Sequence, residues 1–195
     1  MENLPSIPNS SKKFALALLN EVPFFGIIQA AFESVLNIRD AVFMQKVNQF
    51  LYATGDISEK DKEEFLRKLE NTGKKEELGT ALLLLIEKAD EIKKPLYIGR
   101  VMAAHIRGEI DYDTTLRLCY IISRSYTVDL KLLVGFQDGV QGDSETIADS
   151  LFSVGVLSND GVDGGMITEE GSSGTIYSVN EYGRLIAKHA LPNEQ

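Results

Sequence analysis

Apolar residues recur at helical spacing through most of this chain, and glycine or proline interrupts the pattern at short intervals. The interruptions fall at Pro23, Gly55, Gly73, Pro95 and Gly108. Proline is tolerated in the first turn of a helix, and glycine readily adopts the left-handed conformation that ends one. The pattern therefore predicts a mainly α protein, built as a bundle of consecutive helices joined by short turns.

Five helices are expected before Gly135. They run from Pro23 to about Ala53, from Ser58 to about Thr72, from about Lys75 to Ile92, from Pro95 to Gly108, and from Asp111 or Asp113 to about Val134. Ser58 is followed three residues later by Asp61, which is typical of a capped helix start. The run from Ala81 to Ile86 is apolar on all sides, which places its helix in the middle of the bundle.

One short pattern occurs twice between expected helices. Gly55-Asp56-Ile57-Ser58 and Gly108-Glu109-Ile110-Asp111 each combine a glycine, an acid, an isoleucine and a capping residue. A calcium loop would need carboxylates at positions before the glycine, where this chain has almost none. We interpret the pattern as a helix corner in which glycine ends one helix, isoleucine enters the core and Ser or Asp caps the next.

After Gly135 the sequence becomes rich in glycine and polar residues, which indicates a boundary. A helix is expected from about Ser144 to Val156, followed by a loop over 158–165. Two short β runs, 166–168 and 175–179, are joined across the glycine-rich residues 171–174, which is typical of a hairpin. Asn180 is positioned to cap a last helix, Glu181 to Ala190. Helix, hairpin and helix form the closing half of a winged helix.

These expectations define three parts of the chain. Residues 1–13 are polar and contain two prolines, so we expect a flexible arm. Residues 14–134 form the helical bundle, and residues 135–195 form a winged-helix-like subdomain with a C-terminal β-hairpin and closing helix.

The charge distribution argues against nucleic acid as a partner. The 195 residues carry a net charge of −9, and residues 141–195 contain nine acidic and only two basic side chains. Proteins that bind nucleic acid need local lysine and arginine to neutralise phosphates. The segment most like a DNA-binding module is thus the most acidic one, and we expect it to contact protein.

The sequence contains no recognisable catalytic or cofactor-binding motif. Its two histidines, His105 and His189, lie far apart in sequence, and we expect His105 to be a partly buried, hydrogen-bonded residue. The single cysteine, Cys119, lies in an apolar helical segment and should behave as a small hydrophobic residue. We therefore predict no catalytic residue, no cofactor and no small-molecule substrate.

A lone cysteine also bears on location. It permits no disulfide within the chain, and the first residues lack the features of a secretory signal. We expect a cytoplasmic protein.

The loop from Asn159 to Glu170 partly resembles a cation-binding loop. Asn159, Asp163 and Glu170 stand at the first, fifth and twelfth positions, but the third is Gly161. Because calcium needs a fuller set of oxygen ligands, we favour an acidic turn and predict no metal site.

Two surfaces are candidates for contact with a partner. The apolar stretch from Phe14 to Phe32 is near the length needed to span a membrane, but Asn20, Glu21 and Pro23 interrupt it. We expect buried helices there, with an exposed edge at Phe24 and Phe25 as the alternative. Four arginines at regular spacing form the second candidate surface, and pairing with neighbouring acids is the favoured interpretation of them: Arg100, Arg107, Arg117 and Arg124.

The order of several segments resembles a known group of proteins. These segments are Glu21-Val22-Pro23-Phe24, the apolar run 82–86, the segment 95–100, the corner 108–112 and the closing residues 177–183. The chain resembles small helical bacterial proteins, including those grouped as abortive-infection alpha proteins in phage defence. The resemblance implies a cytoplasmic bacterial protein linked to defence, and it implies no functional residues.

The leading hypothesis from the sequence is a non-enzymatic module that binds another protein or a second copy of itself. A winged-helix regulator that binds nucleic acid is one alternative. A membrane-associating effector acting through residues 14–32 is another.

Overall fold

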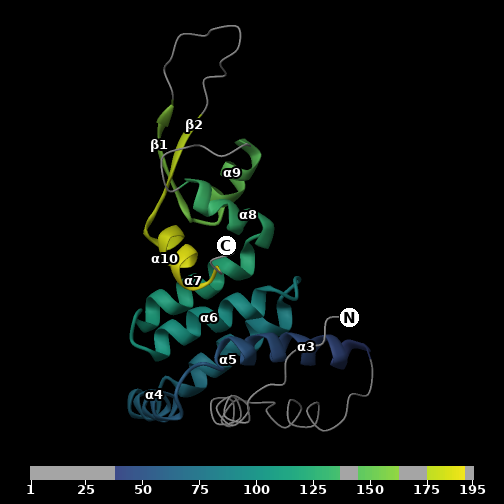
Figure 1. The fold of residues 1–195 in the computed structure, drawn as a ribbon, viewed down its shortest axis with the longest axis vertical. Helices are drawn as coiled ribbons and strands as arrows, with labels where there is room; N and C mark the ends of the chain where they lie inside the picture. Colours follow the sequence, from purple (N-terminus) through teal and green to yellow (C-terminus); the bar gives the residue numbers. More distant parts are fainter. Residues whose placement is uncertain (1–37, 137–144, 163–174, 192–195) are drawn as a thin grey trace, which may run out of the picture. The chain divides into compact units, whose positions relative to one another are not determined.

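The computed structural model describes residues 38–136, 145–162 and 175–191 (Figure 1). In these residues the chain is mainly helical and contains one small antiparallel sheet, as the sequence predicts. The predicted arm and the stretch from Phe14 to Phe32, with Phe24 and Phe25, lie outside the described residues. Among the described helices, none combines the length and apolar character needed to cross a membrane.

The chain forms two compact units, one ending at Cys119 and the other beginning at Tyr120. The sequence predicts a boundary near Gly135, after the last helix of the bundle. The earlier division arises because the elements just after Tyr120 pack against the C-terminal helices and strands. Each unit is described separately below.

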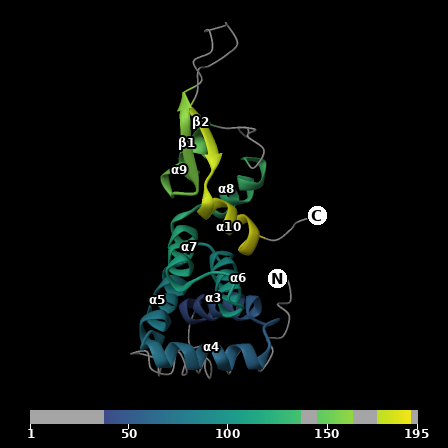
Figure 2. The ribbon, with the colours of Figure 1, turned by 90° about the vertical axis from the view of Figure 1, so that its left-hand side faces the viewer.

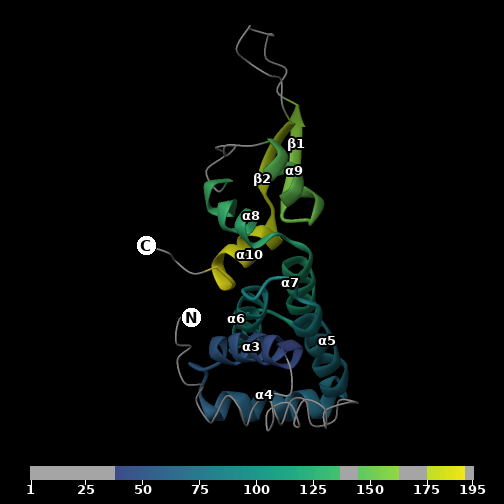
Figure 3. The same cartoon turned by 90° about the vertical axis from the view of Figure 1, so that its right-hand side faces the viewer.

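The described residues of the N-terminal unit, 38–119, form four complete helices and the start of a fifth. These are α3 (Ile38–Ala53), α4 (Glu59–Thr72), α5 (Lys75–Lys88), α6 (Lys94–Ile106) and the first residues of α7 (Tyr112–Arg124). The most extensive helix contact joins α3 and α6. Figures 2 and 3 show α5 standing beside the end of α4, with which it is in contact. Leu51, Leu78, Leu82, Ile98 and Met102 are among the fully buried side chains of this unit.

Most of the predicted helix ends in this unit are confirmed. Ser58 caps α4 by accepting a hydrogen bond from the Asp61 amide, and Gly73 ends α4 with φ of 67°. Pro95 lies in the first turn of α6. Both corner isoleucines are buried, Ile57 at 5% exposure and Ile110 at 8%. The repeated pattern therefore serves as a helix corner.

Expectations for the third and fifth predicted helices are wrong in detail. The helix α5 ends at Lys88 instead of Ile92, and Leu84 on it is 44% exposed, so this helix is not buried on all sides. The helix expected to run to Val134 stops at Arg124. There the Ser125 hydroxyl donates to the Ile121 carbonyl and Tyr126 adopts an extended conformation, so the helix cannot continue.

The C-terminal unit holds the remaining elements. They are the end of α7, α8 (Thr127–Lys131), the 3-10 helix η1 (Leu132–Phe136), α9 (Glu145–Ser153), β1 (Leu157–Val162), β2 (Thr175–Val179) and α10 (Glu181–His189). The two strands pair antiparallel, with Leu157 opposite Val179 and Val162 opposite Thr175. Tyr177 and Val179 of β2 face the core of the unit, where α9, α10 and η1 contact the strand.

The predicted β run 175–179 is confirmed, but its partner is a different segment. Its partner is β1, most of which the sequence analysis assigned to a loop over 158–165. The strand was not predicted because Asn159 and Gly161 are residues typical of turns. The Asn159 side chain accepts a hydrogen bond from the Gly161 amide at 2.8 Å, and Gly161 has φ of 123°. This local bond makes a β-bulge inside the strand. The predicted run 166–168, the turn 171–174 and the residues Asp163 and Glu170 lie outside the described residues.

The last helix begins where the sequence predicts. Asn180 caps α10 by accepting from the Gly183 amide at 3.0 Å. Its side-chain amide also donates to the carbonyls of Gly155 and Leu157, before and at the start of β1. One residue thus ties the end of α9, the strand and the closing helix together.

Candidate functional site

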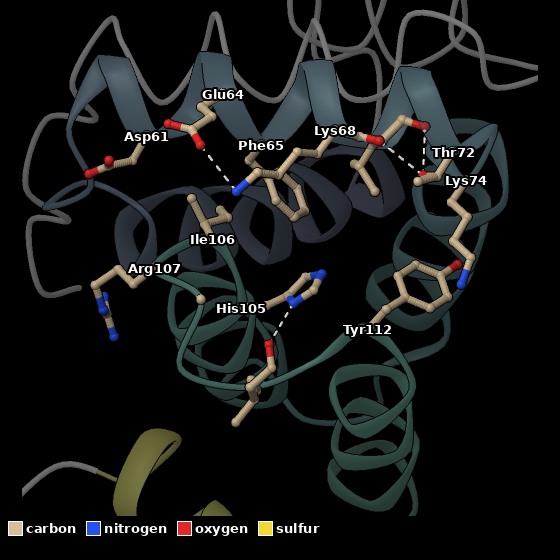
Figure 4. A pocket seen from close by; sticks show the side chains of 13 residues that line it. Asp61, Glu64, Phe65, Lys68, Thr72, Lys74, His105, Ile106, Arg107 and Tyr112 are labelled. Atoms are coloured by element: carbon tan, nitrogen blue, oxygen red, sulfur yellow. Dashed lines mark hydrogen bonds and ion pairs between the residues drawn. The ribbon is translucent and has the colours of Figure 1, made fainter.

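A pocket of about 520 Å³ lies between α4 and the connection from α6 to α7 in the N-terminal unit (Figure 4). Its lining combines apolar, aromatic and charged side chains. From α4 come Asp61, Glu64, Phe65, Lys68, Leu69 and Thr72, and Lys74 follows that helix. The rest come from the end of α6 (His105 and Ile106), the turn after it (Arg107, Gly108 and Ile110) and the start of α7 (Tyr112).

One wall of the pocket is a single face of α4. Its members are spaced by three or four residues, and residues at this spacing lie on one side of a helix. Phe65 and Leu69 are buried at 6% and 4% exposure and form the apolar part of this wall. Asp61 and Thr72 lie at its two ends.

The other wall is the helix corner between α6 and α7. Gly108 has φ of 76°, and its amide donates to the His105 carbonyl to end α6. Ile110 then enters the core, and Asp111 begins α7 by accepting from the Thr114 amide at 2.8 Å. Hydrogen bonds from Thr114 hold the pKa of Asp111 below its usual value. These local interactions fix the corner, and with it His105 and Tyr112 on either side.

His105 is held in one orientation by a backbone carbonyl. Its Nδ1 lies 2.9 Å from the Ile110 oxygen. A carbonyl only accepts hydrogen bonds, so Nδ1 carries the proton and Nε2 is the acceptor in the neutral ring. Burial lowers the pKa of His105, against weaker opposing effects of the Ile110 carbonyl and Asp111. Figure 4 shows the second nitrogen turned toward the C-terminal end of α4.

Aromatic rings continue from His105 in both directions. The ring of Phe65 stands edge-on to it with centroids 5.1 Å apart, and the Tyr112 ring is 6.2 Å away. The Lys74 ammonium lies over the Tyr112 ring, 4.0 Å from its centre. The arrangement provides an apolar surface with polar groups at defined places.

The cations of the lining differ in what they contact. Lys68 pairs with Glu64 at 3.1 Å, and Arg107 pairs with Glu109. In Figure 4 the Arg107 guanidinium points away from α4. In the part of the chain that the structure describes, no carboxylate is paired with Lys74.

The Thr72 hydroxyl of the lining is bonded to its own helix. The Thr72 hydroxyl donates to the carbonyls of Lys68 and Leu69 in its own helix, so its proton is committed to the backbone. An activated nucleophile instead needs an adjacent base that takes its proton. Within the described residues, no three side chains of His, Cys, Asp or Glu lie close enough together to hold a metal ion.

Each of the four predicted arginines has its own surroundings in the described structure. Arg107 lines the pocket, whereas Arg100 lies with its guanidinium carbon 5.9 Å from the centre of the Tyr97 ring. Arg117 and Arg124 are exposed on α7. For Arg107, the pairing with an acid that the sequence favoured is confirmed.

Sequence reasoning missed the pocket although it found one of its walls. The Gly108–Asp111 corner was identified, and His105 was correctly expected to be partly buried and hydrogen-bonded. Nothing in the pattern indicated that the corner faces α4. The alternation of Phe65, Lys68, Leu69 and Thr72 on one helix face is the signal that could have suggested a mixed polar and apolar surface.

Cys119 is in the core of its unit, as its apolar neighbours predicted. The side chain is fully buried, and burial raises the pKa of its thiol to about 12. A thiol of this kind is a weak nucleophile at neutral pH.

The pKa of His105 can be measured directly. We expect an NMR titration of the His105 ring in the folded protein to give a midpoint below 6.5, because burial disfavours the charged ring. The folded state then binds this proton less readily than the unfolded chain. His105 therefore favours folding above pH 6.5, and its contribution is lost as the pH falls through the folded-state pKa.

His105→Gln provides the control for that titration. The variant should unfold in urea with a weaker dependence on pH over the acid range than the parent protein. A midpoint for His105 at or above 6.5 would contradict the assignment of a neutral, buried ring.

Comparison with protein-family models, with curated proteins and with solved structures finds no match to this chain.

Proposed function

We propose that this chain is a non-enzymatic protein-binding module, and that the pocket between α4 and the α6–α7 corner receives a short segment of a partner protein. The supporting observation is the composition of the pocket. A buried apolar surface around Phe65 and Leu69 lies beside fixed polar groups, among them His105 and Lys74. Pockets of this kind accept an anchoring side chain, and such anchors supply most of the binding energy in protein interfaces.

The charged groups of the lining support binding over catalysis. Lys68 and Arg107 are paired with acids, and exposed ion pairs of this kind contribute little to stability. They act as a polar rim, which in protein interfaces surrounds the apolar contact. The Thr72 hydroxyl is bonded to its own helix, which leaves no prepared nucleophile among the lining residues.

The wider setting of the protein belongs to the same proposal. We propose a cytoplasmic bacterial protein with a role in phage defence, on the basis of the resemblance noted in the sequence. We also propose that α9, β1, β2 and α10 form a winged-helix-like element. Its order of elements supports this, because helix, two antiparallel strands and a closing helix follow one another.

The C-terminal unit favours contact with protein over contact with nucleic acid. The helix α9 contains no lysine or arginine. Its Asp149 accepts a hydrogen bond from the Tyr177 hydroxyl at 2.6 Å, and Ser150 of the same helix donates to Asp129. A helix that contacts phosphates needs cations where this one holds carboxylates.

Site-specific photocrosslinking in the native cells tests the proposed function. A photoreactive amino acid placed at Lys68, on the rim of the pocket, should give one discrete adduct with another protein. The same amino acid at Arg67, which is exposed on α4 but does not line the pocket, should not give it. Mass spectrometry identifies the adduct.

A pocket-filling variant shows whether the adduct depends on the pocket. Thr72→Trp places a large ring at the exposed end of the pocket and should abolish the adduct from position 68. Asn71→Trp, at the adjacent exposed residue outside the lining, should leave it unchanged. An adduct that persists with Thr72→Trp, or turnover of nucleotides or nucleic acid by the purified protein, would contradict the proposal.

A further inference from the structure

One cation of the pocket lining, Lys74, lies just after the C-terminal end of α4 and contacts an aromatic ring. The residue Lys74 is half-buried, and its ammonium lies 4.0 Å from the centre of the Tyr112 ring. A cation over an aromatic face is held in place by the ring quadrupole, but its N–H donors are not used up by that contact. Lys74 is thus positioned and still able to bind an anion.

Three backbone carbonyls near the end of α4 already accept hydrogen bonds from other groups. The last carbonyls of α4 would otherwise attract a cation at this end of the helix. The Thr72 hydroxyl donates to the carbonyls of Lys68 and Leu69, and the Gly73 amide donates to the Glu70 carbonyl. The Lys74 amide itself donates to the Leu69 carbonyl.

The neighbouring carboxylate is occupied as well. Glu70, at the end of α4, accepts from the buried ammonium of Lys75 at 2.8 Å. Glu64, farther along the same helix, is paired with Lys68. Both of these α4 carboxylates are therefore paired with other lysines. Lys74, the residue that precedes α5, is left able to pair with a carboxylate from outside.

A second polar group of defined character lies in the same part of the pocket. Because Nδ1 of His105 donates to the Ile110 carbonyl, its Nε2 is a hydrogen-bond acceptor turned toward the end of α4 (Figure 4). An acceptor selects a ligand that offers an N–H group, such as a peptide backbone. Between the two groups and the helix lies the apolar surface of Phe65 and Leu69.

We propose that the pocket recognises an acidic segment of a partner protein, in which a carboxylate side chain stands next to an apolar one. Lys74 binds the carboxylate, His105 accepts a backbone N–H, and the apolar side chain packs on Phe65 and Leu69. This inference rests on the proposed function and adds the chemistry of the partner.

Two capped dipeptides test the charge requirement. They are acetyl-phenylalanyl-glutamyl-amide and its neutral counterpart acetyl-phenylalanyl-glutaminyl-amide, which differ only in the carboxylate. Binding to the full chain is followed by NMR shifts of the amides of Leu69, Lys74, Ile110 and Tyr112. We expect the acidic dipeptide to bind roughly tenfold more tightly, the difference expected from one favourable charge contact.

Two matched variants assign that difference to one residue. Lys74→Gln should make the two dipeptides bind equally, while Arg67→Gln should preserve the preference because Arg67 is exposed on α4 and does not line the pocket. Raising the salt concentration should reduce the preference in the parent protein. The amide spectrum of each variant shows whether it is folded.

The outcomes separate this inference from the proposed function. Equal affinity of the two dipeptides, no shifts at millimolar concentration, or a preference that survives in Lys74→Gln would overturn the acidic-segment inference. A Lys74-dependent preference without any photocrosslinked protein would leave an acid-binding pocket and remove the protein partner. A pocket-dependent protein adduct with no preference for the acidic dipeptide would do the reverse.

Discussion

Gly183→Ala should destabilise the C-terminal unit by about 3 kcal/mol, the upper part of the range for overpacked sites. Gly183 lies in the first turn of α10, where a Cβ atom would collide with the carbonyl oxygen of Val156. The same Cβ would lie 2.7 Å from Cγ1 of Val179. Alanine normally favours a helix by up to about 1 kcal/mol relative to glycine, so the steric cost must outweigh that gain.

The collision is costly because its partner is fixed backbone. The Val156 oxygen accepts a hydrogen bond from the Asn180 amide at 3.1 Å, and the Asn180 side chain caps α10 through the Gly183 amide. Moving α10 with its cap away from Val156 would break the bond from the Asn180 amide and the two bonds from the Asn180 side chain to Gly155 and Leu157. A flexible side chain could rotate out of the way, whereas this hydrogen-bonded turn cannot.

Urea unfolding followed by circular dichroism measures the effect of Gly183→Ala. Lys188→Ala, at an exposed position on the same helix, is the control and should change stability by less than about 0.5 kcal/mol. Hydrogen exchange should show the loss of protection in β1, β2 and α10. A variant that matches or exceeds the parent in stability would contradict the close contact between α10 and Val156.

Gly99→Ala should destabilise the N-terminal unit by about 2 kcal/mol, again through overpacking. Gly99 lies in α6 where this helix crosses α3. A Cβ atom there would lie 2.6 Å from the Phe50 oxygen and 2.7 Å from the Ala53 Cβ. The two helices would have to separate, which would loosen the packing of Phe50 and Leu51 in the core.

A double-mutant cycle isolates the contact between α3 and α6. Ala53→Gly removes one of the two atoms that the new methyl group would meet, so it should recover part of the stability lost in Gly99→Ala. The Phe50 oxygen remains, and recovery should be incomplete. Additive effects of the two substitutions, or stabilisation by Gly99→Ala alone, would show that the helices do not approach this closely.

Helix ends were predictable because they depend on neighbouring residues. Ser58, Gly73, Gly108 and Asn180 act through hydrogen bonds or backbone angles within a few positions of themselves. The strand β1 was not predictable in this way. Asn159 and Gly161 are typical of turns, and they became part of a strand because β2 pairs with them across a bulge.

In the candidate site, too, features set by neighbouring residues were predictable and features set by distant residues were not. The character of His105 could be predicted from its place at the end of an amphipathic helix before the Gly108 corner. The availability of Lys74 could not, because it depends on Tyr112 lying beneath its ammonium and on Lys75 holding Glu70. Sequence reasoning instead selected the four arginines, and Arg107 alone among them lines the pocket.

Local sequence patterns were enough to predict the mainly helical class, the corner that repeats at Gly55 and Gly108, and the capped closing helix. Each of these depends on short-range propensity and hydrogen bonding, which a local pattern carries in full. The tertiary structure decided the strand that pairs with β2, the close approach at Gly99 and Gly183, and the meeting of α4 with the α6–α7 corner. These features depend on which distant segments pack together, and packing is specified by the shape and burial of many residues at once.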